Sequence, residues 1–379
     1  MKTIETIIIG AGPAGLATAA RLRKFGLNFE VLEQSDKVAN AWHNHYDRLC
    51  LHTVKQFSNL PYVPFPKEFP LYVPRLELVQ YLEDYAKQFD IKPYFNHKVT
   101  AVNKADNGKW LVETANEASF LADNVVIATG TNHTPNVPTW QGQEQYQGEI
   151  MHTRFYKNPK PYLGKKVLVI GMGNTGAEIA LDLSEHDVDV AISIRNPICI
   201  TPRDVNGRPA QVTAKQLQKL PKWLAQWIAK QVRNVVIGDL TKYGVPISKM
   251  DPVEQLLTTG KTPVVDLGTA KHIKEGRIKI FGEIAHFNPT DIQFKDGKQQ
   301  DFDVVLLATG YHAEVDKIVE KMDNSLDKYN LPKEKVGTAY HEGLYFVGYD
   351  NYKLGGLLGT IFTDSETIAE AIQERSVTI

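Results

Sequence analysis

The chain has 379 residues, 42% of them hydrophobic, and its formal net charge at pH 7 is −1. This length allows two or three domains, and the hydrophobic content can bury a substantial core. Because 43 basic residues nearly balance 44 acidic ones, the composition excludes a protein whose overall charge attracts nucleic acid or an anionic membrane.

Cys50 and Cys199 are the only cysteines. Two cysteines are too few for a disulfide framework or a sulfur-ligated metal site, and no C-x-x-C redox pair is present, so we expect no metal and a reducing compartment. A strand pattern that begins by Ile4 leaves no room for a signal peptide, and no apolar run approaches the ~18 residues needed to span a bilayer. The sequence therefore predicts a cytoplasmic protein without stable membrane insertion.

The first predicted strand ends in IIIGAGPAGL, residues 7–16. A helical pattern follows over residues 14–25, and the strand pattern NFEVLEQ, residues 28–34, completes a βαβ unit. Such a glycine-rich turn between a strand and a helix is typical of a site for a dinucleotide, whose pyrophosphate lies at the start of the helix.

Each glycine of this turn has a separate physical role. Gly10 permits the tight turn, Gly12 lets the backbone approach a pyrophosphate, and Gly15 lets the helix pack against the strand. An acidic residue lies at the end of the second strand, about 20 residues downstream, where its carboxylate would accept the ribose hydroxyls. The predicted contacts of this first site are Gly10, Gly12, Pro13, Ala14, Gly15, Glu33 and Gln34.

The segment of residues 35–74 is rich in Pro, His and aromatic residues and lacks long periodicity. We interpret it as an ordered loop, which is usually functional at this length, with a packed loop of no chemical role as the alternative. An amphipathic helix is predicted over residues 75–89. The Asn-Gly turn at residues 107–108 then indicates an antiparallel meander before the strand that ends in ATG at Gly130.

The second half repeats this order of elements. A strand enters GMGNTG at residues 171–176, a helix runs to Ser184, and a strand ends at Arg195. After a variable insertion, a further strand pair leads to a second ATG at Gly310. We interpret this repetition as an internal duplication. The predicted fold class is α/β, with two Rossmann-like dinucleotide-binding domains that each carry a small inserted antiparallel β-meander.

The two predicted sites differ at the end of their second strand. Glu33 favours a free ribose and would repel a 2′-phosphate, whereas Ser193 and Arg195 offer a hydroxyl and a guanidinium that suit one. We therefore predict FAD in the first half and NADPH in the second. Arg203 and Lys215 are weaker candidates for the same phosphate, and the alternative for Arg195 is a solvated surface charge.

These assignments give the predicted domains. Residues 1–160 form the first part of an FAD-binding domain, residues 161–310 form an NADPH-binding domain with a helical insertion at 198–274, and residues 311–379 return to the FAD-binding domain. The last part would bring a strand and a glycine-rich turn, with Gly348 and Gly355, to the far end of the FAD. In the insertion, residues 221–237 predict a core or lid helix, with a helix at a membrane surface or substrate entry as the alternative.

Several segments resemble the class B flavin-containing monooxygenases, and most closely the YUCCA-type enzymes and their bacterial relatives. They are GAGPAGL, YDRLCLHTVKQFSNLPYVPFP from Tyr46, the linker YQGEIMHTRFY, GMGNTG and LLATGY. The family's linker reads F-x-G-x-x-x-H, followed after three intervening residues by Tyr or Phe. Here Tyr146 replaces the first Phe, while Gly148, His152 and Tyr156 match.

The resemblance implies an NADPH-dependent FAD monooxygenase. Such an enzyme forms a flavin C4a-(hydro)peroxide and inserts one oxygen atom of O₂ into a small organic substrate, here a 2-oxo acid, sulfide, amine or ketone. Aligning Lys55 and Gln56 with the family's Lys-Glu pair puts His52 at the position of a family Asn near the flavin, which makes His52 the candidate catalytic residue. This departure puts amine and sulfide substrates in doubt, and a purely structural His52 is the alternative.

The remaining candidate contacts lie in the long loop and near the strand ends. On the FAD side they are Trp42, His43, Leu49, Thr53, Val99, Ala128, Thr129 and Gly130; on the NADPH side they are Gly171, Gly173, Asn174, Thr175, Gly176, Ala308, Thr309 and Gly310. His152, Thr129 and Thr309 would position domains and cofactors. A homodimer is the expected assembly. Two other functions remain open: a flavoprotein reductase that passes electrons to a protein or quinone, and a non-enzymatic NADPH/NADP⁺ sensor.

Overall fold

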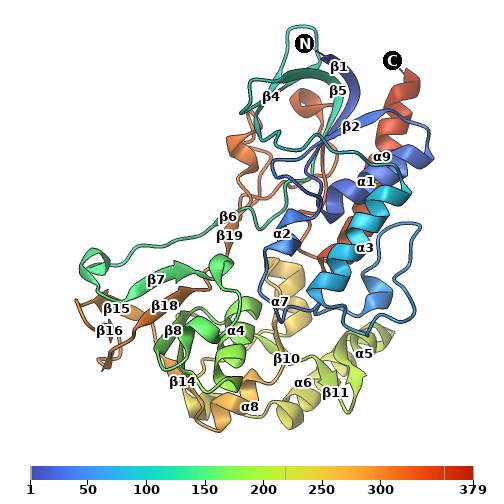
Figure 1. Ribbon diagram of the computed structural model, residues 1–379. Coiled ribbons are helices and arrows are strands. Elements are labelled where there is room, and N and C mark those ends of the chain that lie inside the picture. The colour runs from blue at the N-terminus through green and yellow to red at the C-terminus, as the bar shows by residue number, and fades with distance from the viewer. Residues whose placement is uncertain (1, 218, 354, 379) are drawn as a thin grey trace. The chain divides into compact units, whose positions relative to one another are not determined.

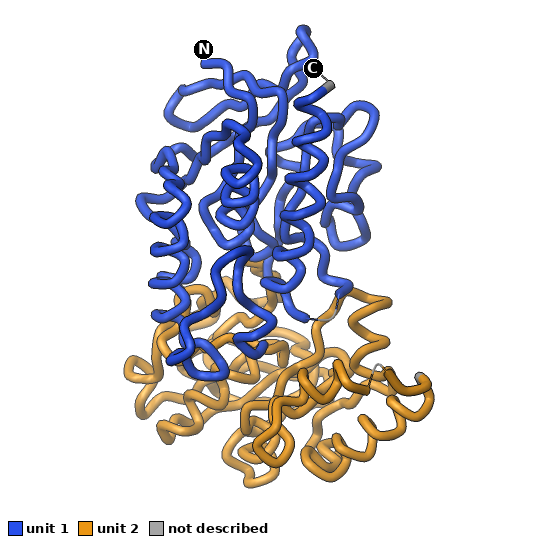
Figure 2. Tube along the Cα trace, turned by 90° about the vertical axis from the view of Figure 1, so that its right-hand side faces the viewer, with its two compact units in different colours: residues 1–44, 53–134, 311–379 blue, residues 45–52, 135–310 orange. Residues whose placement is uncertain are grey.

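The structure of the protein is a computed structural model that describes residues 2–217, 219–353 and 355–378 (Figure 1). The chain divides into two compact units, coloured separately in Figure 2. Unit 1 comprises Met1–Asn44, Thr53–Thr134 and Tyr311–Ile379, and unit 2 comprises His45–His52 and Pro135–Gly310.

A six-stranded sheet forms the centre of unit 1. Its parallel part has the order β2 (Phe29–Leu32), β1 (Lys2–Ile9), β5 (Ser119–Ile127) and β20 (Leu344–Phe346). The predicted meander is present as β3 (Val99–Lys104) and β4 (Trp110–Thr114), which pair antiparallel with each other, and β4 also pairs antiparallel with the start of β5.

The main helices of unit 1 are α1 (Pro13–Lys24), α3 (Arg75–Gln88) and α9 (Gly356–Thr378); α2 (Asn40–His43) is a single turn. Arg21 of α1 is buried and binds α9 through Ser365 Oγ at 3.1 Å and the Phe362 carbonyl at 3.0 Å. The C-terminal helix therefore packs on the helix that follows the first glycine turn.

Unit 2 is built around a five-stranded parallel sheet with the order β14 (Ile278–Phe281), β9 (Asp189–Ser193), β8 (Lys166–Ile170), β18 (Val304–Leu307) and β7 (Glu149–His152). The central strand β8 is buried on both faces. Val167 and Val169 pack in one core cluster with α4 (Asn174–Glu185), while Leu168 and Ile170 pack with the second predicted meander. That meander comprises β15 (Ile284–Phe287), β16 (Ile292–Phe294) and β17 (Gln299–Gln300).

The other elements are short except for α6 (Lys222–Val236), which has 15 residues. In unit 2 they are β10 (Ile200–Pro202), β11 (Asp204–Val205), β12 (Arg208–Pro209), α5 (Ala210–Leu217), α6 (Lys222–Val236), α7 (Pro252–Thr259), β13 (Val264–Asp266) and α8 (Thr269–Lys274); β6 (Thr134–Pro135) and β19 (Tyr311–His312) lie where the chain passes between units. None of the described helices is both long enough and apolar enough to cross a membrane.

The predicted fold class, two Rossmann-like domains with inserted meanders, agrees with this architecture, but three details differ. The chain leaves unit 1 after Thr134 rather than at 160, because β7 pairs with β18 in the sheet of unit 2. The segment His45–His52 also belongs to unit 2. Finally, a core position is wrong for three apolar side chains of α6: Trp223, Trp227 and Val235 are 71%, 57% and 84% exposed.

Candidate functional site

The first glycine turn has the backbone that its sequence predicts. Gly10 has φ +110°, and a Cβ there would lie 2.6 Å from the Ala128 carbonyl oxygen. At Gly15 a Cβ would lie 1.9 Å from the Gly10 carbonyl oxygen. Both positions therefore exclude side chains, the first because of its left-handed φ and both because strand, turn and helix lie in direct contact.

Gly12 is different, because the space beside it is open. It is the N-cap of α1 with φ −82° and ψ −175°, and a Cβ there would meet no atom within 4 Å. Pro13 is the first residue of the helix, and no side chain makes a cap hydrogen bond. The first-turn N–H groups of a helix lack intrahelical partners, so this arrangement is a cradle for an anion such as a pyrophosphate.

Glu33 lies beside the turn and is 8% exposed. One carboxylate oxygen accepts a hydrogen bond from Ala11 N at 2.8 Å, and the other accepts from Ser35 N at 2.9 Å and Ser35 Oγ at 2.7 Å. A carboxylate offers about four acceptor sites, two on each oxygen, so the oxygen bonded to Ala11 N can accept one further hydrogen bond. Glu33 thus fixes the turn and can still accept a hydrogen bond from the ribose. Gln34 is exposed.

The second glycine turn repeats this geometry. Gly171 has φ +103° and a Cβ there would lie 2.7 Å from the Ala308 carbonyl oxygen, while a Cβ at Gly176 would lie 2.0 Å from the Gly171 carbonyl oxygen. Gly173 is the N-cap of α4, again with φ −82° and ψ −175° and with no atom within 4 Å of a built Cβ. The chain therefore contains two cradles of one design.

The residues around the second turn are not equally available to a nucleotide. Asn174 uses its side chain to hold the insertion, donating to the Pro263 carbonyl at 3.2 Å and accepting from Val265 N at 2.7 Å. Thr175 follows it in the first turn of α4 and is partly buried. The side chain of Asn174 therefore already has two backbone partners, and its second Nδ2 hydrogen and second Oδ1 acceptor site are what it could still offer to a ligand.

The four candidates for the 2′-phosphate also differ, and Lys215, the weakest of them, is an exposed residue of α5. Ser193 is buried and donates its hydroxyl hydrogen to the Gly282 carbonyl at 2.7 Å. Arg203 pairs with Asp204 at 2.8 Å. Arg195 lies two residues beyond the end of β9, is exposed, and makes no hydrogen bond or ion pair with any residue that the structure describes. Arg195 is therefore the cation best placed to receive an anion.

The ATG turns are held by long-range hydrogen bonds. In unit 1, Thr129 Oγ1 lies 2.7 Å from the hydroxyl of Tyr349, whose burial raises its pKa to about 12. In unit 2, Thr309 Oγ1 donates to the Asn136 carbonyl, and the Gly310 carbonyl accepts from His152 Nε2 at 3.1 Å. Burial lowers the pKa of His152 below its ordinary value. Sequence reasoning missed Tyr349 and Asn136, because neither lies in a motif.

The candidates from the long loop and the last strand take several positions. Arg75 holds α2 by donating to the Trp42 and His43 carbonyls at 3.5 and 2.8 Å, and His43 Nε2 lies 3.0 Å from Glu83. Thr53 bonds Ser58. The other candidates divide by environment: Gly130 and Gly355 have positive φ and open space for a Cβ, Gly348 packs against Ala14 and Ile361, Val99 is buried in the core of unit 1, and Leu49 packs on the core of unit 2.

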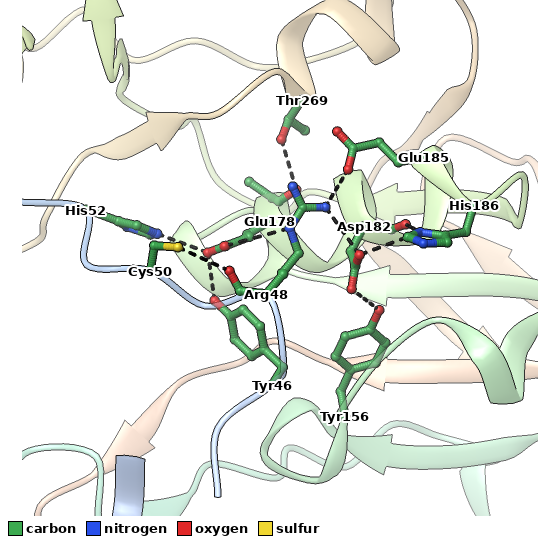
Figure 3. Close-up of polar contacts among 11 residues, drawn as sticks. Tyr46, Arg48, Cys50, His52, Tyr156, Glu178, Asp182, Glu185, His186 and Thr269 are labelled. Carbon is green, nitrogen blue, oxygen red and sulfur yellow. Dashed lines mark hydrogen bonds and ion pairs between the residues drawn. The ribbon is translucent and has the colours of Figure 1, made fainter. Parts of the chain in front are cut away.

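His52 lies in unit 2, whereas the sequence predicted this segment to be part of the first domain. Its Nε2 is 2.9 Å from Oε2 of Glu178, a buried residue of α4 (Figure 3). The Tyr46 hydroxyl donates to the same oxygen at 2.7 Å. Glu178 and Asp182 are charged residues one turn apart among the apolar positions Ala177, Ile179, Ala180, Leu181 and Leu183, a sequence signal for this cluster that our sequence reasoning did not use.

A metal centre is not visible in the part of the chain that the structure describes. No group of three or more His, Cys, Asp or Glu side chains in these ranges could hold a metal ion. Cys50 and Cys199 are not joined in a disulfide, and burial raises the pKa of Cys199 to about 11. A thiol that keeps its proton is a poor nucleophile, so the arrangement favours dinucleotide binding over covalent cysteine chemistry.

Comparisons with known proteins agree with this geometry. The family described as "Flavin-binding monooxygenase-like" matches residues 3–334. The chain is 36% identical, over 98% of its length and 88% of the relative, to the probable indole-3-pyruvate monooxygenase YUCCA7 of Arabidopsis thaliana. It is 37% identical, over 97% of its length and 90% of the relative, to the indole-3-pyruvate monooxygenase YUCCA1 of Oryza sativa subsp. japonica.

Solved structures show the same fold. A variant of the flavin monooxygenase from Stenotrophomonas maltophilia is similar with a TM-score of 0.76 and 21% sequence identity, over 99% of this chain and 100% of that one. At this level of identity the similarity speaks for the architecture alone.

Proposed function

The chain belongs to the flavin-binding monooxygenase-like family, and from this premise we propose that it transfers one oxygen atom of O₂ to a small 2-oxo acid, with indole-3-pyruvate as the first candidate. The predicted class of enzyme, an FAD- and NADPH-dependent monooxygenase, is confirmed by the family and its relatives. The substrate is proposed because the two relatives named above are a probable indole-3-pyruvate monooxygenase and an indole-3-pyruvate monooxygenase.

The observation that carries the proposal is the pair of equal glycine cradles. Gly12 and Gly173 share one backbone conformation, and each leaves open the space that a Cβ would occupy. A backbone that approaches a pyrophosphate needs this space. The cradles thus fit the two dinucleotides: we place FAD at unit 1, beside Glu33, and NADPH at unit 2, beside Arg195.

In this proposal the bound FAD supplies the redox chemistry, taking up hydride from NADPH and reacting with O₂. The protein binds the two cofactors and the substrate and orients them. Glu33 accepts the adenosine ribose hydroxyls of the FAD, Arg195 binds the 2′-phosphate of NADPH, and His52 exchanges a hydrogen bond or proton with the reacting ligand. The buried Tyr349 and Thr129 hold the turn above Gly10. The cytoplasm and a homodimer remain the proposed location and assembly.

The substrate is tested with isotope-labelled O₂. Purified enzyme with FAD and NADPH is offered indole-3-pyruvate, other 2-oxo acids, a sulfide, an amine and a ketone, and products are analysed by mass spectrometry. We expect one labelled oxygen in the product of a 2-oxo acid. Labelled product from only the sulfide, amine or ketone would overturn the substrate class while leaving the enzyme class intact.

A further inference from the structure

The segment His45–His52 is part of unit 2 although the residues on both sides of it in the sequence belong to unit 1. Several contacts within unit 2 hold it, in addition to those of Arg48 and His52. Asp47 N donates to the Lys157 carbonyl at 2.8 Å, the Tyr46 hydroxyl binds Glu178, and Leu49 packs on the hydrophobic core. His52 is therefore fixed to the same unit as the second glycine cradle.

The connection between His52 and this cradle is α4. Glu178 lies two residues after Gly176, near the start of the helix whose N-cap is Gly173. Its side chain is only 3% exposed, and its Oε2 accepts from both the Tyr46 hydroxyl and His52 Nε2 (Figure 3). An ionised carboxylate has no hydrogen to donate. When Glu178 is ionised, the hydrogen of the His52–Glu178 bond is therefore on Nε2 of the imidazole.

This bond leaves one nitrogen for other chemistry. Nδ1 of His52 makes no hydrogen bond with any residue that the structure describes, and the side chain is 21% exposed. In a neutral imidazole with its hydrogen on Nε2, Nδ1 carries the lone pair. We propose that Glu178 is a positioning residue that holds His52 in the Nε2–H form, so that Nδ1 accepts a hydrogen bond or a proton from the ligand.

The role of Glu178 rests on the proposed function in one respect only: that function supplies the ligand that would bind Nδ1 of His52. This role also specifies a direction for the hydrogen bond, since a neutral His52 in this form accepts at its free nitrogen and cannot donate there. A carboxylate that fixes the tautomer and orientation of a histidine is a general device in enzymes.

The charged residues near Glu178 have carboxylate, hydroxyl or imidazole partners of their own. Arg48 lies 4.0 Å from Glu178, but its guanidinium binds Glu185 at 2.6 Å and Asp182 at 3.3 Å. Asp182 also accepts from the Tyr156 hydroxyl at 2.7 Å and lies 3.7 Å from His186. Arg48 would thus keep two carboxylate partners if Glu178 were removed, so an apolar replacement of similar size should be tolerated.

The first test observes the imidazole itself and needs no turnover. Nitrogen NMR of histidine-labelled FAD-bound enzyme at alkaline pH, assigned with His52→Asn, should show a protected hydrogen on Nε2 and an acceptor Nδ1. In Glu178→Met the protection should be lost and the two nitrogens should show averaged tautomer signals. In the control Glu185→Met, on the same helix and also a partner of Arg48, the signals should remain as in the wild type.

The second test separates positioning for chemistry from simple anchoring of the segment. The amide of Asn lies where Nδ1 of histidine lies, and that of Gln lies where Nε2 lies. With indole-3-pyruvate as the probe, we expect His52→Asn to keep kcat/KM within about tenfold and His52→Gln to lose ~100-fold or more.

The reverse order, with Gln the better replacement, would show that only the Glu178 contact matters and would overturn the proposal. So would a wild-type imidazole with its hydrogen on Nδ1, or an unchanged spectrum in Glu178→Met. Because the NMR result does not depend on turnover, an inactive enzyme with the expected spectrum would count against the proposed substrate and not against Glu178.

Discussion

Arg195 is the residue on which the choice between NADPH and NADH depends. Its guanidinium has no partner among the described residues, whereas Arg203 is paired with Asp204. A charge-assisted hydrogen bond contributes ~1.5–3 kcal/mol, so Arg195→Ala should raise KM for NADPH roughly 10- to 150-fold. KM for NADH, which lacks the 2′-phosphate, should change little.

Steady-state kinetics with both nucleotides measure this difference, with Arg203→Ala as the control. The control should change KM for NADPH much less. Equal increases for NADPH and NADH in Arg195→Ala would remove this residue from the phosphate site.

The burial of His152 should make the free energy of unfolding depend on pH. Burial lowers its pKa in the folded protein, so the unfolded chain binds a proton at a higher pH than the folded one. Stability must then fall as the pH decreases through the ordinary pKa of histidine, ~6.5. Urea unfolding at about pH 7.5 and about pH 5.5 measures the loss. In His152→Gln the loss should be smaller; an equal loss in both proteins would contradict this role of His152.

At the scale of elements, substitutions at two glycines of the first turn should have different effects. A side chain at Gly12 enters open space, so Gly12→Val should fold normally but lose FAD because the cradle is filled. At Gly15 even a methyl group meets the Gly10 carbonyl, so Gly15→Ala should destabilise unit 1, by ~1–3 kcal/mol. FAD content and thermal melting of the FAD-free protein distinguish the two effects.

Gly173→Val is the matched variant in unit 2. It should keep its FAD and its melting temperature but bind NADPH much more weakly, because the second cradle has the same open geometry. If Gly12→Val impaired NADPH binding and Gly173→Val impaired FAD binding, the two cofactors would have to exchange places.

The elements also show which parts of the structure were predictable. The glycine turns and their strands follow from contacts close in sequence, such as the approach of Gly15 to Gly10, and the sequence pattern predicts them well. The location of His45–His52 depends instead on partners such as Tyr46 and Glu178, which are 132 residues apart. No local pattern contains that information, so this segment was expected to lie with the first domain.

Side-chain roles near the turns were harder to predict for a related reason. Asn174 follows a glycine motif in the expected position, yet its amide binds the backbone of Pro263 and Val265. Val99 was a candidate contact but its side chain lies in the core of unit 1. Motifs predict where the backbone meets a ligand, whereas the side chains respond to neighbours that are distant in sequence.

At the scale of the whole molecule, one chain contains two cradles whose cofactors take part in one proposed reaction. The same fold could serve a reductase that passes electrons to a protein or quinone. The two functions differ in what the reduced enzyme does with O₂, because a monooxygenase must hold activated oxygen until the substrate arrives, whereas a reductase has no such requirement.

The most direct test is therefore a stopped-flow experiment. Enzyme with FAD is reduced anaerobically with NADPH and mixed with O₂ while NADP⁺ is bound. The account predicts a transient that absorbs well to the blue of oxidised flavin and decays faster when indole-3-pyruvate is added. Direct return of the oxidised flavin spectrum without such a transient, at the same rate with and without substrate, would contradict it.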